Sequence, residues 1–110
     1  MEELVKGDVV VLPFPYSDLS SSKKRPALII GILESNDVIL CQITSKQRND
    51  KYSIGLRDSD FKQGKLNLDS YIRSNRIFTA DKSLIFYKVG SIKETKTHEV
   101  IEGVIKILRQ

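Results

Sequence analysis

The sequence is poor in the residue types that most often build metal and nucleophile centres. Its 110 residues include one cysteine, Cys41, one histidine, His98, and no tryptophan. One cysteine offers no pair for a zinc site and no internal disulfide. The chain also lacks a glycine-rich phosphate loop and a GxSxG nucleophile elbow. We therefore expect no metal ion and no other cofactor.

The single cysteine and the single histidine both have simple structural explanations. Cys41 lies in the apolar run from Val38 to Ile43 without a histidine nearby in the sequence, so we expect a buried, unreactive thiol. A lone free cysteine also fits a reducing cytoplasm. His98 falls in the middle of a predicted helix, where a solvated or partly packed side chain is expected rather than a ligand.

Long apolar runs are absent as well. No stretch approaches the roughly 20 apolar residues that a membrane-spanning helix needs, and the amino-terminal MEELVKGD has no apolar signal region. Hydrophobic residues nevertheless make up 40% of the chain, which is typical of a folded protein. We expect one soluble, cytoplasmic domain that spans residues 1–110.

Three short apolar runs without alternation dominate the first half of the chain: Val9 to Leu12, Ala27 to Leu33 and Val38 to Ile43. Such runs predict strands that are buried on both faces, in the middle of a small closed or strongly curved sheet. Residues 34–37 between the second and third runs predict a hairpin turn.

The second half predicts further strands and one helix. We expect strands at 51–57, 70–80 and 83–92, and a loop at 58–68. From about Glu94 to Arg109 the apolar residues recur at helical spacing. Ser91 with Glu94 fits a capping box before this helix, and Thr95 is the alternative cap. Short strands followed by one late helix favour a mainly β fold, an SH3-like small barrel with a C-terminal α-helix.

The net charge is +4, and the basic residues gather in three groups near the ends of predicted strands. The groups are Lys23, Lys24 and Arg25; Lys46, Arg48 and Lys51; and Arg73 and Arg76. The first ends a polar loop from Ser17 to Lys24, which we expect to be mobile. If the strand ends meet at one rim of the sheet, these charges form a patch that attracts phosphates. Ordinary surface charge is the alternative explanation.

Polar side chains also share faces with one another on two predicted strands. Because side chains two apart point the same way, Tyr71, Arg73 and Asn75 share one face while Ile72 and Phe78 share the other. Gln42 and Thr44 likewise share a face. Should the two strands border one cleft, Gln42, Thr44, Arg73 and Asn75 would line it together with Arg25.

Four segments carry a family resemblance: KGDVVVLPFP, KRPALII, QITSK and GKLNLDSYIRSNRIFTADKSLI. In this order, and followed by a terminal helix, they resemble the MazF/PemK-like toxins of bacterial type II toxin-antitoxin systems. The resemblance implies the same barrel in a homodimer that is neutralised by an acidic antitoxin. It also implies a metal-independent, sequence-selective endoribonuclease that cuts single-stranded mRNA and so inhibits translation. The ribose 2′-hydroxyl is the attacking group, and the products carry a 2′,3′-cyclic phosphate and a 5′-hydroxyl.

The resemblance also implies a set of site residues. Arg25 matches the active-site arginine of the family, Thr44 its threonine beside the scissile bond, and Arg73 an arginine of the PemK-like branch. An arginine suits this chemistry because its guanidinium is permanently charged and matches phosphate oxygens in bidentate geometry. The remaining candidates for RNA contact are Lys23, Lys24, Gln42, Lys46, Asn75, Arg76 and Tyr16, the last as a stacking residue.

The sequence departs from the family pattern at two places. Asn75 stands where PemK-like members have an acidic residue, and an amide cannot serve as general acid or base at neutral pH. Some members have a histidine in the first loop, where this chain has Tyr16, Asp18 and serines. An exposed Asp18 would be a weak base, so the sequence does not identify the base.

Two other functions are compatible with the same fold. The first is a non-catalytic module that binds RNA or protein, which Asn75 and the missing histidine favour. The second is a gyrase inhibitor, since a related toxin family shares this fold and acts through its C-terminal helix. The apolar positions of the helix in this chain are expected to pack on the core instead.

Overall fold

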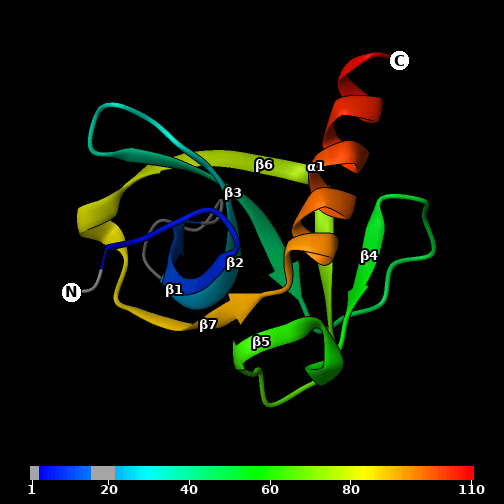
Figure 1. Ribbon diagram of the computed structural model, residues 1–110, viewed down its shortest axis with the longest axis horizontal. Coiled ribbons are helices and arrows are strands. Elements are labelled where there is room, and N and C mark those ends of the chain that lie inside the picture. The colour runs from blue at the N-terminus through cyan, green and yellow to red at the C-terminus, as the bar shows by residue number, and fades with distance from the viewer. Residues whose placement is uncertain (1–2, 16–21) are drawn as a thin grey trace.

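The computed structural model describes residues 3–15 and 22–110. Within these ranges the chain forms seven strands and one α-helix (Figure 1). The elements are β1 (Asp8–Pro15), β2 (Ser22–Ile32), β3 (Asp37–Thr44), β4 (Ser53–Leu56), β5 (Phe61–Gly64), β6 (Ser70–Asp81), β7 (Tyr87–Ile92) and α1 (Glu94–Leu108). Two short 3-10 turns, Asp58–Asp60 and Lys82–Leu84, precede β5 and β7.

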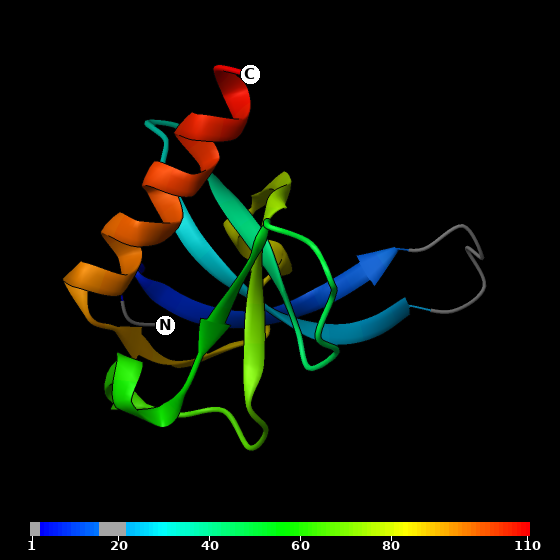
Figure 2. The same ribbon diagram turned by 90° about the vertical axis from the view of Figure 1, so that its right-hand side faces the viewer.

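The strands form one antiparallel sheet in the order β4-β6-β3-β2-β1-β7-β5. The sheet curls into a half-barrel, and α1 lies across one of its faces (Figures 1 and 2). The three strands with continuous apolar sequence, β1, β2 and β3, occupy the middle of the order. The predicted mainly β barrel with a C-terminal helix is thereby confirmed.

The central strands are buried on both faces, as their unbroken apolar sequences predict. Adjacent residues such as Val9 and Val10 are both fully buried, and they belong to different clusters. One cluster, the helix-side core, joins the sheet to α1 through Val100 and Val104. Its other members are Val9, Leu28, Cys41, Ile43, Leu56, Phe61, Ile72 and Ile92. The cluster on the opposite face, the second core, contains Leu4, Val10, Leu12, Ala27, Ile29, Val38, Leu40, Ala80 and Ile85.

The helix begins without the predicted capping box. Its N-cap is Lys93, which makes no side-chain capping hydrogen bond. Ser91 lies in β7 instead, where its hydroxyl donates to the carboxylate of Asp8 over 2.8 Å. Asp8 is fully buried. Its carboxylate also accepts a hydrogen bond from the backbone N–H of Val5 and forms an ion pair with Lys88. This satisfied carboxylate fixes the start of β1 against β7.

The basic residues 23–25 lie on a strand rather than on a loop, so the prediction of a mobile basic loop from Ser17 to Lys24 is wrong at its carboxyl end. β2 already begins at Ser22, and β1 continues to Pro15. The two strands pair through Pro13 with Lys24 and Leu12 with Arg25. Tyr16 and Asp18 lie outside the described residues.

The segment 58–68 also contains more structure than the predicted loop. Phe61 is buried in the helix-side core and pairs with Ile92, which adds β5 to the edge of the sheet. Gly64 has a φ of +73° and lies opposite Gly90. A Cβ on either glycine would overlap a backbone carbonyl oxygen of the facing strand. The close approach of β5 to β7 therefore requires glycine at both positions.

The prediction that Ile72 and Phe78 share a face is wrong, because β6 contains a bulge between them. Ile72 pairs with Ile43 and Ile77 pairs with Cys41, so five steps along β6 match two steps along β3. The extra residues reverse the face of the sheet to which the side chains after the bulge point. Ile72 consequently packs in the helix-side core and Phe78 against the second core, although a regular strand would place them on the same face.

Cys41 is fully buried, as predicted, and desolvation by this burial raises the pKa of its thiol to about 12. The thiol is therefore neutral at physiological pH and is a poor nucleophile. No helix in the described ranges is long and apolar enough to cross a membrane.

Two glycine substitutions should change stability in opposite directions. In α1, a Cβ on Gly103 would meet only ordinary contacts, Ile54 Cδ1 at 3.5 Å and Ser74 Cβ at 3.6 Å. Gly103→Ala should therefore stabilise the fold by about 0.5–1 kcal/mol. Gly90→Ala should destabilise it by about 1–3 kcal/mol, because its Cβ would press into the backbone of β5. Urea unfolding of both variants measures the two changes, and a loss of stability in Gly103→Ala would contradict the packing described for α1.

Candidate functional site

The candidate site lies where the pairing between β2 and β3 ends. The last pair in this ladder is Ala27 with Gln42, on the face of the second core. Continuing the same register by two residues brings Arg25 alongside Thr44. Thr44 in turn pairs with Tyr71 on β6. Arg25, Thr44 and Tyr71 therefore form a row across three neighbouring strands.

A cavity of about 210 Å³ opens at this point, and both Arg25 and Thr44 line it. Pro26, which also lines it, has no N–H with which to extend the ladder toward β3. The remaining walls come from the ends of β3 and the segment before β6: Ile43, Ser45, Leu66, Asn67, Leu68 and Ser70. The structure thus brings together Arg25 and Thr44, which are 19 residues apart in the sequence.

Thr44 is held in a defined orientation. It is buried, and its Oγ1 accepts the backbone N–H of Lys46 over 3.1 Å. The hydroxyl hydrogen remains available for donation, because the bond to Lys46 uses only an acceptor lone pair. Arg25 is half-buried in its cavity. The pair offers one permanent cation and one hydroxyl donor on rigid strand backbone.

Successive side chains of β2 point to opposite faces of the sheet, which separates three basic residues that are consecutive in the sequence. Lys23 and Arg25 pair with Phe14 and Leu12, whose side chains belong to the second core or pack against it. Lys24 points to the other face, where its Nζ lies 5.1 Å from the ring centroid of Phe86. Lys23 therefore adds charge on the face of Arg25, and Lys24 does not.

Arg73 is buried and engaged with an acidic residue that sequence reasoning missed. Its Nη2 donates to Asp50 Oδ2 over 3.2 Å, and its Nε has no hydrogen-bond partner among the described residues. Asp50 also accepts the backbone N–H of Tyr52. The ion pair joins residues that are 23 apart, so no local pattern indicated it.

The other predicted contact residues lie elsewhere. Gln42 and Arg76 line a different cavity, of about 500 Å³, together with residues of the second core and Ile77 and Leu84. Lys46 and Asn75 are exposed. The prediction that one cleft holds Gln42, Thr44, Arg73 and Asn75 together with Arg25 is therefore met only for Thr44 and Arg25.

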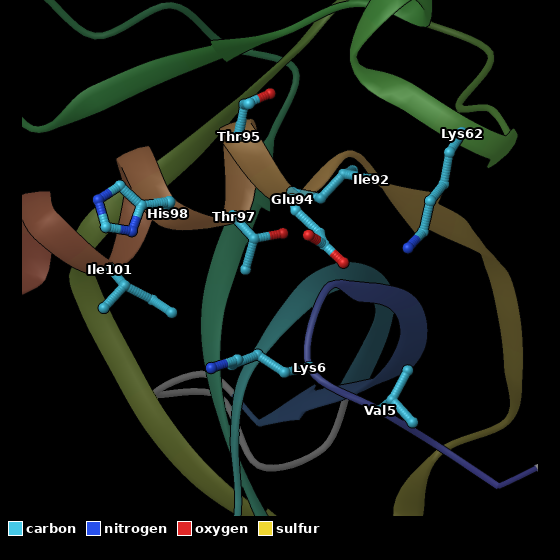
Figure 3. Close-up of a pocket in the computed structure, with 9 residues that line it drawn as sticks. All are labelled: Val5, Lys6, Lys62, Ile92, Glu94, Thr95, Thr97, His98 and Ile101. Carbon is cyan, nitrogen blue, oxygen red and sulfur yellow. The ribbon is translucent and has the colours of Figure 1, made fainter.

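A larger cavity, of about 730 Å³, lies at the start of α1 (Figure 3). His98 contributes to its wall and is exposed, in agreement with the predicted solvated helical histidine. Lys6, Lys62 and Glu94 also line it, but none of the predicted site residues does. In the described parts of the chain, no group of three or more His, Cys, Asp or Glu residues is arranged to hold a metal ion.

Solved structures of endoribonucleases and of a MazE-MazF complex have the same fold. One is an endoribonuclease in complex with its cognate antitoxin from a mycobacterial species, with a TM-score of 0.77, 17% identity, and coverage of 96% of this chain and 95% of that one. A mycobacterial endoribonuclease has a TM-score of 0.73 and 19% identity, with 98% and 93% covered. The MazE-MazF complex of Deinococcus radiodurans has a TM-score of 0.73 and 17% identity, with 96% and 95% covered. At identities this low, the structural likeness shows the fold alone.

The family itself is established by sequence. No curated protein sequence matches the chain. The family model described as PemK-like, MazF-like toxin of type II toxin-antitoxin system matches residues 5–108, nearly the whole chain. The chain therefore belongs to the PemK-like, MazF-like toxin family of type II toxin-antitoxin systems.

Proposed function

We propose that this toxin is a metal-independent endoribonuclease that cuts single-stranded mRNA at selected sequences and thereby inhibits translation. The observation that carries this proposal is the cavity shared by Arg25 and Thr44, in a chain of a toxin family whose fold occurs in solved endoribonucleases. These two residues match the arginine and threonine that the family resemblance assigns to the scissile region.

RNA supplies its own nucleophile, which explains how so few protein groups suffice. The 2′-hydroxyl attacks the adjacent phosphorus, the bond to the 5′-oxygen breaks, and the products are a 2′,3′-cyclic phosphate and a 5′-hydroxyl. Negative charge builds on the phosphoryl oxygens during this step, and a guanidinium held in place stabilises it. Arg25 has this role. The hydroxyl of Thr44 donates to a phosphate oxygen and fixes the scissile linkage beside Arg25.

Arg73 contributes a second phosphate contact, at the cost of its bond to Asp50. A phosphate oxygen that displaced the carboxylate would keep the guanidinium paired, so the exchange leaves no buried charge unsatisfied. Lys23 and Lys46 are exposed cations that attract the RNA backbone, and Gln42, Arg76 and the exposed Asn75 contact nucleotides farther along the strand.

The cellular partner of this proposed enzyme is an acidic antitoxin. Solved relatives include a complex of an endoribonuclease with its cognate antitoxin and a MazE-MazF complex. A cationic groove that binds RNA also suits an acidic, partly disordered peptide, which would cover Arg25 and block the substrate. A protein that cuts mRNA and is neutralised by an antitoxin would act in the cytoplasm, and this is the location we propose.

The active form is a homodimer. Apolar side chains surround the 500 Å³ cavity, and two of them, Ile77 and Leu84, are 38% and 49% exposed. A second copy would bury such surface. Light scattering should give twice the chain mass of 12.5 kDa, and Ile77→Asp should shift the protein toward the single chain. A wild-type mass of one chain at micromolar concentration would contradict the dimer.

Removal of the guanidinium of Arg25 should abolish most of the cleavage. We expect Arg25→Ala to lower kcat by about 100- to 1,000-fold, the usual cost of losing one group that stabilises transition-state charge. The measurement is cleavage of a long single-stranded RNA in excess EDTA. Arg109→Ala is the matched control, because it removes an exposed arginine at the end of α1 and should cut at the wild-type rate.

Two outcomes would contradict this function. If the wild type cut RNA only when divalent metal was present, the metal-independent mechanism would be wrong. Salt-sensitive RNA binding without strand scission under any condition would instead identify a binding module.

A further inference from the structure

A cation and an aromatic ring meet directly beside the candidate site. The guanidinium carbon of Arg57 lies 5.1 Å from the ring centroid of Tyr71, within the range of a cation–π interaction. Tyr71 is the β6 partner of Thr44, so the two residues are neighbours across adjacent strands about 5 Å apart. The ring therefore continues the row that starts with Arg25 and Thr44.

The position of Arg57 is fixed by the strand on the far side of Tyr71. Gly55 of β4 pairs with Tyr71, and it has no side chain to occupy the next place in the row. Arg57 fills this place: a Cβ on Gly55 would meet its Nη1 at 3.4 Å. The same Nη1 donates to the carbonyl oxygen of Ser70 over 3.2 Å, and Nε lies 3.7 Å from Asp69 Oδ2. The guanidinium is therefore held over the ring rather than free to rotate.

The arrangement remains accessible from solvent. The Arg57 side chain is 44% exposed, and Tyr71 is half-buried rather than covered by the core. Ser70, which anchors Arg57 through its carbonyl oxygen, also lines the cavity of Arg25 and Thr44. The ring and the guanidinium thus border the place where the scissile phosphate would lie.

We propose that Tyr71 and Arg57 form a stacking platform for the nucleobase next to the scissile phosphate of a single-stranded nucleic acid. This role rests on the proposed function for the place of the phosphate, but the binding itself requires no cleavage. Aromatic rings and guanidinium planes both stack on bases, and a base is available for stacking only when it is not paired in a duplex. The platform therefore selects single strands and orders the nucleotide beside Thr44.

The test compares variants that keep or remove the ring. The probe is a fluorescein-labelled DNA strand of random sequence, which lacks the 2′-hydroxyl and is not cut, with binding measured by fluorescence anisotropy at fixed salt. Tyr71→Leu should weaken binding by about 5- to 150-fold, the usual cost of one lost base–aromatic stack. Tyr71→Phe keeps the ring and should bind within about twofold of the wild type. Tyr87→Leu, at an exposed tyrosine of β7, is the matched control.

A second readout separates stacking from a structural role. Affinity for the same DNA annealed into a duplex depends on charge, so it should stay unchanged in Tyr71→Leu. Thermal unfolding confirms that each variant is folded. Unchanged single-strand binding in folded Tyr71→Leu, or an equal loss for strand and duplex, would overturn the platform. The proposed function is tested separately by wild-type RNA cleavage. Its failure, with the single-strand effect of Tyr71 intact, would leave the platform as a binding site alone.

Discussion

The burial of β1, β2 and β3 on both faces is the constraint on which the rest of the structure depends. These strands have the helix-side core on one face and the second core on the other. A strand between two apolar layers has no place for a polar side chain along its middle, since each buried polar group would need a partner there. Polar chemistry is therefore restricted to the strand ends, and the ends of β2 and β3 are where Arg25 and Thr44 lie.

The same constraint explains why the site is rigid. Arg25 and Thr44 stand two residues beyond the last pair of a ladder whose register is fixed by the two cores. A slip by one residue would move every apolar side chain to the wrong face. The packing of the sheet consequently fixes the positions of Arg25 and Thr44. The ion pair between Arg73 and Asp50 and the cation–π contact between Arg57 and Tyr71 add local order on β6.

The sequence predicts those features that depend on neighbouring residues. Unbroken apolar runs identified the central strands, helical spacing identified α1, and the family resemblance pointed to Arg25 and Thr44. The bulge in β6 escaped prediction because it arises from the pairing of Ile72 and Ile77 with β3, which no single strand encodes. The sequence predicts a loop for the first basic residues of β2 because polar strand ends and loops have the same composition.

Contacts between residues that are distant in the chain could not be predicted from the sequence, for the same reason. Asp50 meets Arg73 across 23 residues, and Arg57 meets Tyr71 only because β4 pairs with β6. Neither pair has a sequence signal, since its geometry exists only once the sheet has formed. The structure also separates Gln42 from the cavity of Thr44, although the two share a face, because the cavity opens beyond the end of the β2–β3 ladder.

In the proposed mechanism, RNA attacks itself while Arg25 and Thr44 hold the scissile phosphate. Its most direct test uses two RNA strands of one sequence that the protein cuts, identical except for a single 2′-deoxyribose just before the scissile phosphate. Both strands are incubated with the wild-type protein in excess EDTA. We predict equal binding of the two strands, and cleavage of the all-ribose strand only. Cleavage of the deoxy-substituted strand at the same phosphate would contradict it, because the attacking oxygen would then come from elsewhere.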